Sequence, residues 1–173
     1  MKYKLIEIKA KYKNHNRLRA ILKSKNAKFK GRYHQIDTYF KVNSGKLKLR
    51  EENKENRLVY YRRENKEGPK QSNVIEFKFN PKLPIKEILT KSLGILVIVD
   101  KKREIYYIDN VKFHLDVVKN LGKFFEIEAL DHRGNISKEK LIKQCKFFLD
   151  LFGIPKSDLI SVSYSDLLLE TFK

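Results

Sequence analysis

Apolar and polar residues alternate with a period of two along most of this chain. The alternating stretches cover residues 3–9, 32–42, 46–52, 57–64, 73–79, 95–108, 111–118 and 123–130. Successive side chains of a β-strand point to opposite faces, so each stretch predicts a strand with one apolar and one polar face. β-Branched and aromatic residues are frequent in these stretches, which also favours strands. We therefore expect about eight strands.

Helical periodicity replaces this pattern in a few places. Four stretches are predicted to be helices, residues 16–26, 84–93, 137–152 and 163–171, and two to be loops, residues 43–46 and 65–73. Pro84 suits the first turn of the second helix, where its missing N–H costs nothing. Ser137 suits the N-cap of the third helix, and Gly153 is positioned to end it. The first helix is basic, with leucine and isoleucine on its apolar face.

The connections between most of the predicted strands are short enough for antiparallel pairing. A chain with many strands and few helices of this kind is typical of the α+β class. We predict an eight-stranded antiparallel β-barrel, closed into a tunnel, with the helices packed outside it. The length of 173 residues predicts a single domain over residues 1–173.

The chain is strongly basic, with 39 Lys and Arg against 21 Asp and Glu and a formal net charge of +18. This balance predicts a polyanionic partner, such as a nucleic acid, a phosphorylated small molecule or an acidic surface. The basic helix predicted at residues 16–26 offers a patch for nucleic acid. Because no nucleic-acid-binding motif accompanies it, we do not expect nucleic acid to be the main partner.

Three features bear on location. Cys145 is the only cysteine, so no disulfide within the chain is possible, which fits a reducing compartment. The first residues carry charges every few positions and lack the apolar segment of a signal peptide. No apolar run is long enough to span a membrane. We therefore expect a cytoplasmic protein with no membrane partner.

Several predicted strands carry charges at spacing two on their polar faces, often of one sign. If the sheet closes, these faces line a common interior. The basic members of this interior are Lys9, Lys48, Arg50, Arg63, Lys101 and Arg103, and the acidic members are Glu7, Asp116, Glu126 and Glu128. Burying such charges costs free energy unless they pair with one another or bind ions.

The two groups of charges suit different ligands. Lysine and arginine are charge-assisted donors to phosphate oxygens, so the basic group suits a chain of phosphates. Glu126 and Glu128 share a strand face, and with a third carboxylate from another strand they suit a hard divalent cation, Mg²⁺ or Mn²⁺. The alternative is that these carboxylates form ion pairs with neighbouring lysines.

A series of segments resembles the CYTH superfamily of triphosphate tunnel metalloenzymes, in particular the branch related to class IV adenylyl cyclases, with thiamine triphosphatases as cousins. The segments are IEIKAKY, HQIDTYF, GKLKLRE, VYYRRENKEGPKQS, VDKKREIYYIDNVKFHLDVVKNLGKFFEIEAL and SYSDLLLE, which span nearly the whole chain. The resemblance implies a tunnel that binds triphosphates with a divalent metal. It also implies an activity, either cleavage of ATP to cyclic AMP and pyrophosphate or hydrolysis of inorganic or organic triphosphates.

The resemblance further implies roles for individual residues. Carried over by position, the metal ligands are Glu7, Glu126 and Glu128, the phosphate-binding residues are Lys9, Lys48, Arg50, Arg63, Lys101 and Arg103, and the catalytic residues are Lys9, Arg63, Lys101 and Asp116. The first glutamate of the family's opening Glu-x-Glu-x-Lys motif falls at Leu5. One acidic ligand of the family pattern is therefore missing, and with it the basis for a second metal ion.

The function that follows is a Mg²⁺- or Mn²⁺-dependent enzyme acting on ATP or another triphosphate. Its leading expected activity is that of a class IV adenylyl cyclase, and the alternative is that of a triphosphatase. The sequence does not distinguish a cyclase from a triphosphatase, and Leu5 supports a further alternative, a non-catalytic module that binds a phosphorylated ligand. His114 is expected to order its neighbours rather than to act as a base, and Tyr61 to line the wall rather than to stack on a nucleobase. Homodimer formation is compatible with the sequence.

Overall fold

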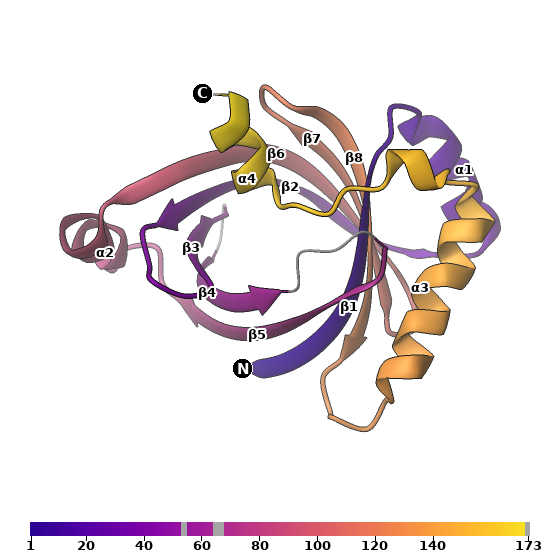
Figure 1. Cartoon of the computed structure of the whole chain (residues 1–173), viewed down its shortest axis with the longest axis horizontal. Coiled ribbons are helices and arrows are strands. Elements are labelled where there is room, and N and C mark those ends of the chain that lie inside the picture. The colour runs from indigo at the N-terminus through magenta and orange to yellow at the C-terminus, as the bar shows by residue number, and fades with distance from the viewer. Residues whose placement is uncertain (53–54, 64–67, 172–173) are drawn as a thin grey trace.

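The computed structural model describes residues 1–52, 55–63 and 68–171, and its strands close into an antiparallel barrel (Figure 1). The strands are β1 (Lys2–Lys11), β2 (Lys28–Phe40), β3 (Lys46–Glu51), β4 (Asn56–Arg63), β5 (Lys70–Phe79), β6 (Ile95–Ile108), β7 (Val111–Val118) and β8 (Gly122–Asp131). Their order around the barrel is β1-β5-β4-β3-β2-β6-β7-β8, and β8 pairs with β1 to close it. The predicted eight-stranded antiparallel tunnel is confirmed.

The predicted helices are present, with small shifts in their bounds. They are α1 (His15–Ser24), α2 (Ile85–Leu93), α3 (Lys138–Phe152) and α4 (Tyr164–Thr171), with a short 3₁₀ turn at Lys156–Asp158. Ser137 caps α3 as predicted, since its hydroxyl accepts the backbone N–H of Lys140 at 3.2 Å. Gly153 ends α3 in the left-handed conformation, at φ 62°. Within the described chain, none of the helices combines the length and the apolar character that crossing a membrane requires.

The loop predicted at residues 65–73 is wrong at its end. Lys70–Phe79 forms β5, in which Lys70 pairs with Glu7 of β1. The turn-forming residues Gly68 and Pro69 suggested a longer loop than the chain has, and residues 65–67 lie outside the described part.

The other predicted loop, residues 43–46, ends where β3 begins at Lys46. Gly45 is required there, because it has φ 68° and a Cβ would lie 2.7 Å from the Tyr60 hydroxyl.

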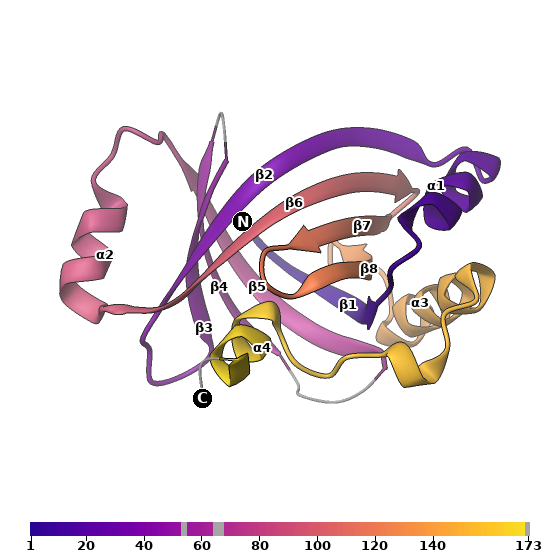
Figure 2. The ribbon, with the colours of Figure 1, turned by 90° about the horizontal axis from the view of Figure 1, so that it is seen from above.

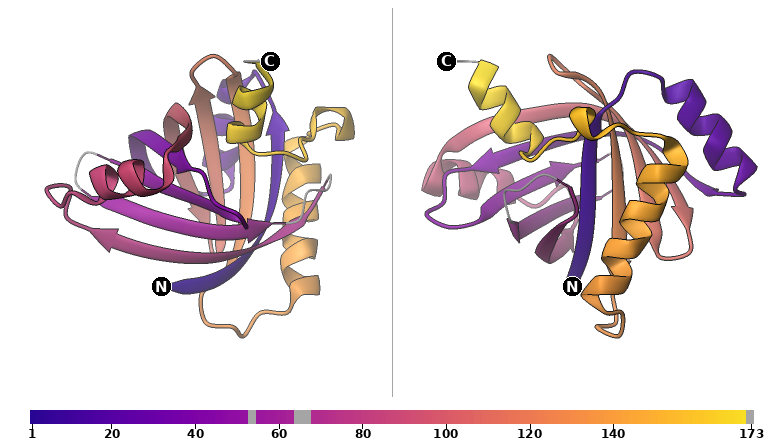
Figure 3. Two further views of the ribbon diagram at one scale, coloured as in Figure 1. Left: turned by 60° about the vertical axis from the view of Figure 1, so that its left-hand side comes forward. Right: turned by 45° about the vertical axis from the view of Figure 1, so that its right-hand side comes forward.

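The helices α1 and α3 lie side by side against the outer face of β1, β7 and β8 (Figures 2 and 3). Phenylalanine rings dominate the core between them. Phe113 contacts Phe148 with 4.8 Å between ring centroids, and Phe125 contacts Phe152 at 4.7 Å. Cys145 is fully buried in this core, as predicted. On the other side of the barrel, α2 covers the outer face near Phe40, Leu49 and Phe79.

Because the helices pack on the outside of the barrel, each strand buries its apolar face against the helices rather than inside the barrel. The apolar faces point outward to the helices, so the charged faces point inward. The remaining helix, α4, closes one end of the tunnel. Its Tyr164 and Leu168 pack on Val97, Val99 and Phe124, which lie on the inward face of their strands.

Candidate active site in the tunnel

The structure brings nearly all of the predicted interior residues to one cavity inside the barrel. Its lining includes Glu7 and Lys9 from β1, Lys48 and Arg50 from β3, Arg63 from β4, Lys101 and Arg103 from β6, and Glu126 and Glu128 from β8. Asp116 is buried behind Arg103 rather than in the lining. The alternation of the strands explains this convergence, because residues two apart point to the same side.

Asp37 organises three of the basic side chains and was not predicted from the sequence. Its carboxylate, 1% exposed, accepts hydrogen bonds from Arg50 at 2.6 and 2.8 Å, from Lys101 at 2.6 Å and from Lys48 at 3.0 Å. Burial alone would raise the pKa of Asp37, but Arg50, Lys101 and Lys48 together hold it well below its usual value. The carboxylate therefore stays ionised and fixes the positions of these cations.

Asp116 positions Arg103 in a similar way. The guanidinium donates to Asp116 at 2.6 Å through Nε and at 2.5 Å through Nη2, and also to Glu126 at 2.9 Å. The Tyr164 hydroxyl of α4 donates to the same carboxylate at 2.7 Å. In this arrangement Asp116 orients Arg103 toward the cavity. The catalytic role expected for Asp116 stays a prediction.

The carboxylate Glu7 lies where β1 meets β8. Arg63 donates to it at 2.8 Å, and it stands directly opposite Glu128 in the strand register. Burial raises the pKa of Glu7, and the nearby charge of Glu126 raises it further, against the opposing effects of Lys9 and Arg63. Like charges facing each other across two strands destabilise a sheet. The Glu7 carboxylate therefore lies where a further cation would be stabilising.

Between Glu126 and Glu128 stands His114, which is 0% exposed. Its Nδ1 lies 2.9 Å from Glu126 Oε2 and 3.6 Å from Glu128 Oε1. Burial, with a further contribution from Arg103, lowers the pKa of His114 to about 4, so the ring is neutral near pH 7 and Nδ1–H can donate to Glu126. This agrees with the expectation that His114 orders its neighbours.

The expected metal ligands are only partly grouped. Within the described residues, His114, Glu126 and Glu128 form a cluster whose ligand atoms all lie within 4.8 Å of one another. Glu7 is not a member of that cluster. The alternative ion pairs with lysine are present as well, with Lys9 at 3.2 Å from Glu126 and Lys112 at 3.4 Å from Glu128. The ligand set Glu7, Glu126 and Glu128 thus remains a prediction.

Leu5 occupies the position of the missing acid and is 5% exposed, packed with Val59, Val74 and Leu130. The free volume that remains in the tunnel is about 110 Å³. This volume is below the range of roughly 300–1,000 Å³ that is usual for small-molecule pockets.

Two lysines outside the predicted interior set bind the segment that leads into α4 to the barrel. Lys70 is 0% exposed and donates to the backbone carbonyls of Ile160 at 2.7 Å and Ser161 at 2.8 Å. Lys46 donates to the Ser163 hydroxyl at 2.6 Å and to Asp166 at 2.5 Å. These contacts hold Ser163 and Tyr164 in the cavity lining.

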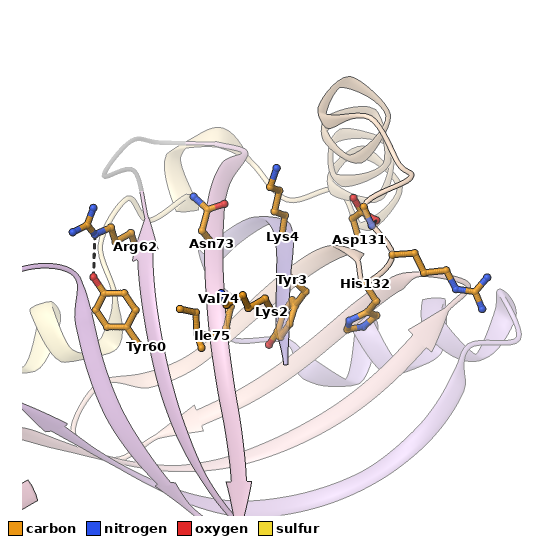
Figure 4. Close-up of a pocket in the computed structure, with 12 residues that line it drawn as sticks. Lys2, Tyr3, Lys4, Tyr60, Arg62, Asn73, Val74, Ile75, Asp131 and His132 are labelled. Carbon is orange, nitrogen blue, oxygen red and sulfur yellow. Dashed lines mark hydrogen bonds between the residues drawn. The ribbon is translucent and has the colours of Figure 1, made fainter.

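A second, larger hollow of about 520 Å³ lies at the start of β1, over β4, β5 and the residues after β8 (Figure 4). Arg62 donates there to the Tyr60 hydroxyl at 3.0 Å, and Tyr3 packs on His132 with 5.1 Å between ring centroids. Its acid, Asp131, accepts backbone N–H groups of Gly134 and Asn135 at 2.7 and 3.2 Å. Because no group of possible metal ligands gathers among the described residues there, we place the candidate active site in the tunnel.

The basic helix α1 is less free to bind nucleic acid than its composition suggests. Arg19 makes two hydrogen bonds to Glu104, each 2.9 Å long, and Arg32 of β2 makes another at 3.2 Å. Part of the positive charge at this surface is therefore paired within the protein.

The chain belongs to the CYTH domain family, whose model matches residues 4–164. A Methanocaldococcus jannaschii protein named "Putative adenylate cyclase" is 29% identical over 177 residues, covering 94% of this chain and 97% of that protein. A solved structure from Pyrococcus horikoshii has a TM-score of 0.78 at 25% identity, covering 94% of this chain and 98% of that one. A Hippeastrum protein described as having a dominant triphosphatase activity has a TM-score of 0.67 at 16% identity, covering 99% and 96%, and shares the fold.

Proposed function

We propose that this CYTH-family protein is an enzyme that binds a linear triphosphate with Mg²⁺ or Mn²⁺ inside the tunnel. The observation that carries the proposal is the charge of the cavity. Among the described lining residues, the basic side chains are Lys9, Lys48, Arg50, Arg57, Arg63, Lys101, Arg103 and Lys112, and the acidic ones are Glu7, Asp37, Glu76, Glu126 and Glu128. This surplus of buried positive charge favours a polyanion.

The triphosphate-binding groups are Lys9, Lys48, Arg50, Arg63, Lys101 and Arg103. Their contacts with Asp37, Glu7, Asp116 and, for Lys9, Glu126 hold the ammonium and guanidinium groups around the cavity before a ligand arrives. Such preorganised cations orient the phosphates and stabilise the charge that develops on a leaving group. Lys9 lies 3.2 Å from Glu126, and Arg63 donates to Glu7 at 2.8 Å. Lys101 lines the same cavity from β6. These three residues, together with Asp116, which orients Arg103, are the proposed catalytic groups.

The carboxylates Glu7, Glu126 and Glu128 are the proposed ligands of the divalent ion. They offer the hard oxygen donors that Mg²⁺ and Mn²⁺ prefer. The raised pKa of Glu7 and its register opposite Glu128 support a cation at this place. When bound, the ion would neutralise phosphate charge and polarise the bond to be broken.

The leading activity is conversion of ATP to cyclic AMP and pyrophosphate. The name of the Methanocaldococcus jannaschii relative supports it. The description of the Hippeastrum protein supports the alternative, hydrolysis of inorganic triphosphate or thiamine triphosphate.

Product analysis distinguishes these activities. Purified protein is incubated with Mg²⁺ or Mn²⁺ and, separately, with ATP, inorganic triphosphate and thiamine triphosphate. We expect turnover that a chelator abolishes, with cyclic AMP and pyrophosphate from ATP if the protein is a cyclase and free phosphate if it is a triphosphatase. Metal-assisted binding of all three without any product would contradict an enzyme and identify a binding module.

A further inference from the structure

The hollow at the start of β1, outside the tunnel, has a row of polar side chains across its floor. Figure 4 shows Arg62, Asn73 and Lys4 side by side. In the strand register, Lys4 of β1 lies opposite Asn73 of β5, and Asn73 lies opposite Arg62 of β4. Because neighbouring strands are about 4.8 Å apart, the two cationic residues are roughly 10 Å apart with the amide between them. An anionic group placed over Asn73 can therefore accept hydrogen bonds from both sides.

The guanidinium of Arg62 is held in place by uncharged groups. It donates to the Tyr60 hydroxyl at 3.0 Å and to the Ser44 hydroxyl at 2.7 Å. A guanidinium has five N–H donors, so further donors are available to a ligand. Neither hydroxyl neutralises the positive charge, which remains available as well.

An apolar row lies beside the polar one. Ile75 of β5 stands between Lys2 of β1 and Tyr60 of β4 in the strand register. Ile75 is a large aliphatic residue and is nevertheless 46% exposed. An organic ligand that covers Ile75 and the ring of Tyr60 removes apolar surface from water, which is favourable.

Charge and volume together define the kind of ligand that fits. Among the described residues that line the hollow, the basic ones are Lys2, Lys4, Arg62 and Arg133, and the acidic one is Asp131. Asp131 is 6% exposed and already accepts the backbone N–H groups of Gly134 and Asn135. The volume of about 520 Å³ lies within the usual range for small-molecule pockets. A second copy of this chain, with a formal net charge of +18, would be repelled by the same cations.

We propose that the hollow is a second ligand site, which binds a small amphipathic anion. Such a ligand carries a phosphate, sulfonate or carboxylate group on an aromatic or branched aliphatic body. The anionic group lies over Asn73 between Lys4 and Arg62, and the apolar body packs on Ile75 and Tyr60.

This site is separate from the tunnel. Successive residues of a strand point to opposite faces, and Leu5 and Val74 line the tunnel. Their neighbours Lys4 and Ile75 therefore point to the outer face. Binding in the hollow consequently does not depend on the proposed triphosphate-binding function, and either can fail without the other.

The test uses naphthalene-1-sulfonate, which joins one anionic group to a ring system and contains no phosphate. NMR spectra of ¹⁵N-labelled protein follow its titration, and inorganic sulfate and 1-naphthalenemethanol are the comparison ligands, each with one half of its chemistry. We expect saturable shifts concentrated at residues 2–4, 60–62 and 73–75, and an affinity about tenfold or more above that of either comparison ligand. Shifts confined to other parts of the chain, or equal affinities for the three ligands, would overturn the proposal. Shifts at these residues that grow with protein concentration alone would assign the face to a second copy and would also overturn it.

Two surface substitutions separate the contributions of charge and apolar contact. Arg62→Gln should weaken binding of naphthalene-1-sulfonate about fivefold or more while changing that of 1-naphthalenemethanol less than about twofold. Ile75→Ser should weaken binding of both ligands. The control is Arg32→Gln, because the Arg32 side chain is 73% exposed and pairs with Glu104 outside the hollow, and it should change neither affinity. Wild-type affinity for the sulfonate in Arg62→Gln would contradict the assignment, and if a variant does not fold, the shifts of the wild-type protein decide.

Discussion

Replacing Glu128 by glutamine is expected to lower metal-dependent turnover of a triphosphate by about a hundredfold or more. Glutamine has nearly the same shape but lacks the charge that makes the side chain a good ligand for Mg²⁺. The side chain of Glu128 is 12% exposed, and its nearest cation is Lys112 at 3.4 Å. Loss of the charge should therefore disturb metal binding more than packing. Initial rates measured over a range of Mg²⁺ and Mn²⁺ concentrations test the expectation.

The matched control is Glu87→Gln on α2. The side chain of Glu87 is 64% exposed and pairs with Lys91 on the same helix, outside the tunnel. Its substitution should leave both the rate and the metal dependence unchanged. A Glu128→Gln protein that is folded by circular dichroism and turns over at the wild-type rate would remove Glu128 from the metal site.

The second large effect is expected from Asp37→Asn, which should destabilise the ligand-free protein by about 3–5 kcal/mol. The substitution leaves Arg50, Lys101 and Lys48 close together in the interior without the carboxylate that neutralises them. For a chain of this size the corresponding fall in Tm is roughly 6–20 °C. Thermal unfolding followed by circular dichroism measures it. Inorganic triphosphate with Mg²⁺ should raise the Tm of the variant more than that of the wild type, because the phosphates replace the lost negative charge.

The same substitution has a defined pH dependence. The pKa of Asp37 in the folded protein lies well below the value of 3.8 that applies when the chain is unfolded. Its contribution to stability is therefore complete above about pH 5 and is lost as the pH falls through 3.8 toward the folded pKa. The difference in stability between wild type and Asp37→Asn should shrink over that acidic range.

The control Asp100→Asn changes an acid whose side chain is 36% exposed and pairs with His34 at the surface. A Tm for Asp37→Asn equal to that of this control would contradict the role assigned to Asp37.

Strand faces could be predicted from the sequence because the period of two is a local property. Glu126 and Glu128 were placed together on one face by that period alone, and the structure has them on the tunnel side. The order of the strands around the barrel could not be obtained in this way. It depends on pairings between distant segments, such as that of β2 with β6.

The site residues that the sequence did not predict are those whose role depends on contacts between distant parts of the chain. Asp37 has no acidic partner two residues away, so it did not stand out, and its importance follows from its register opposite Arg50 on β3. The turn-forming residues Gly68 and Pro69 predict a loop that includes Lys70, whereas Lys70 begins β5. Tyr164 was recognised only as part of a short helix, since its contact with Asp116 joins residues 48 positions apart.

The most direct test of the central claim, that the tunnel holds a divalent metal with a triphosphate, is a crystal structure with Mn²⁺ and diimidotriphosphate. The anomalous signal of manganese identifies the metal position independently of the protein coordinates. The account predicts a manganese peak at Glu7, Glu126 and Glu128, with the phosphates among Lys9, Arg50, Lys101 and Arg103. A triphosphate bound on the outer surface, or manganese bound only outside the tunnel, would contradict it.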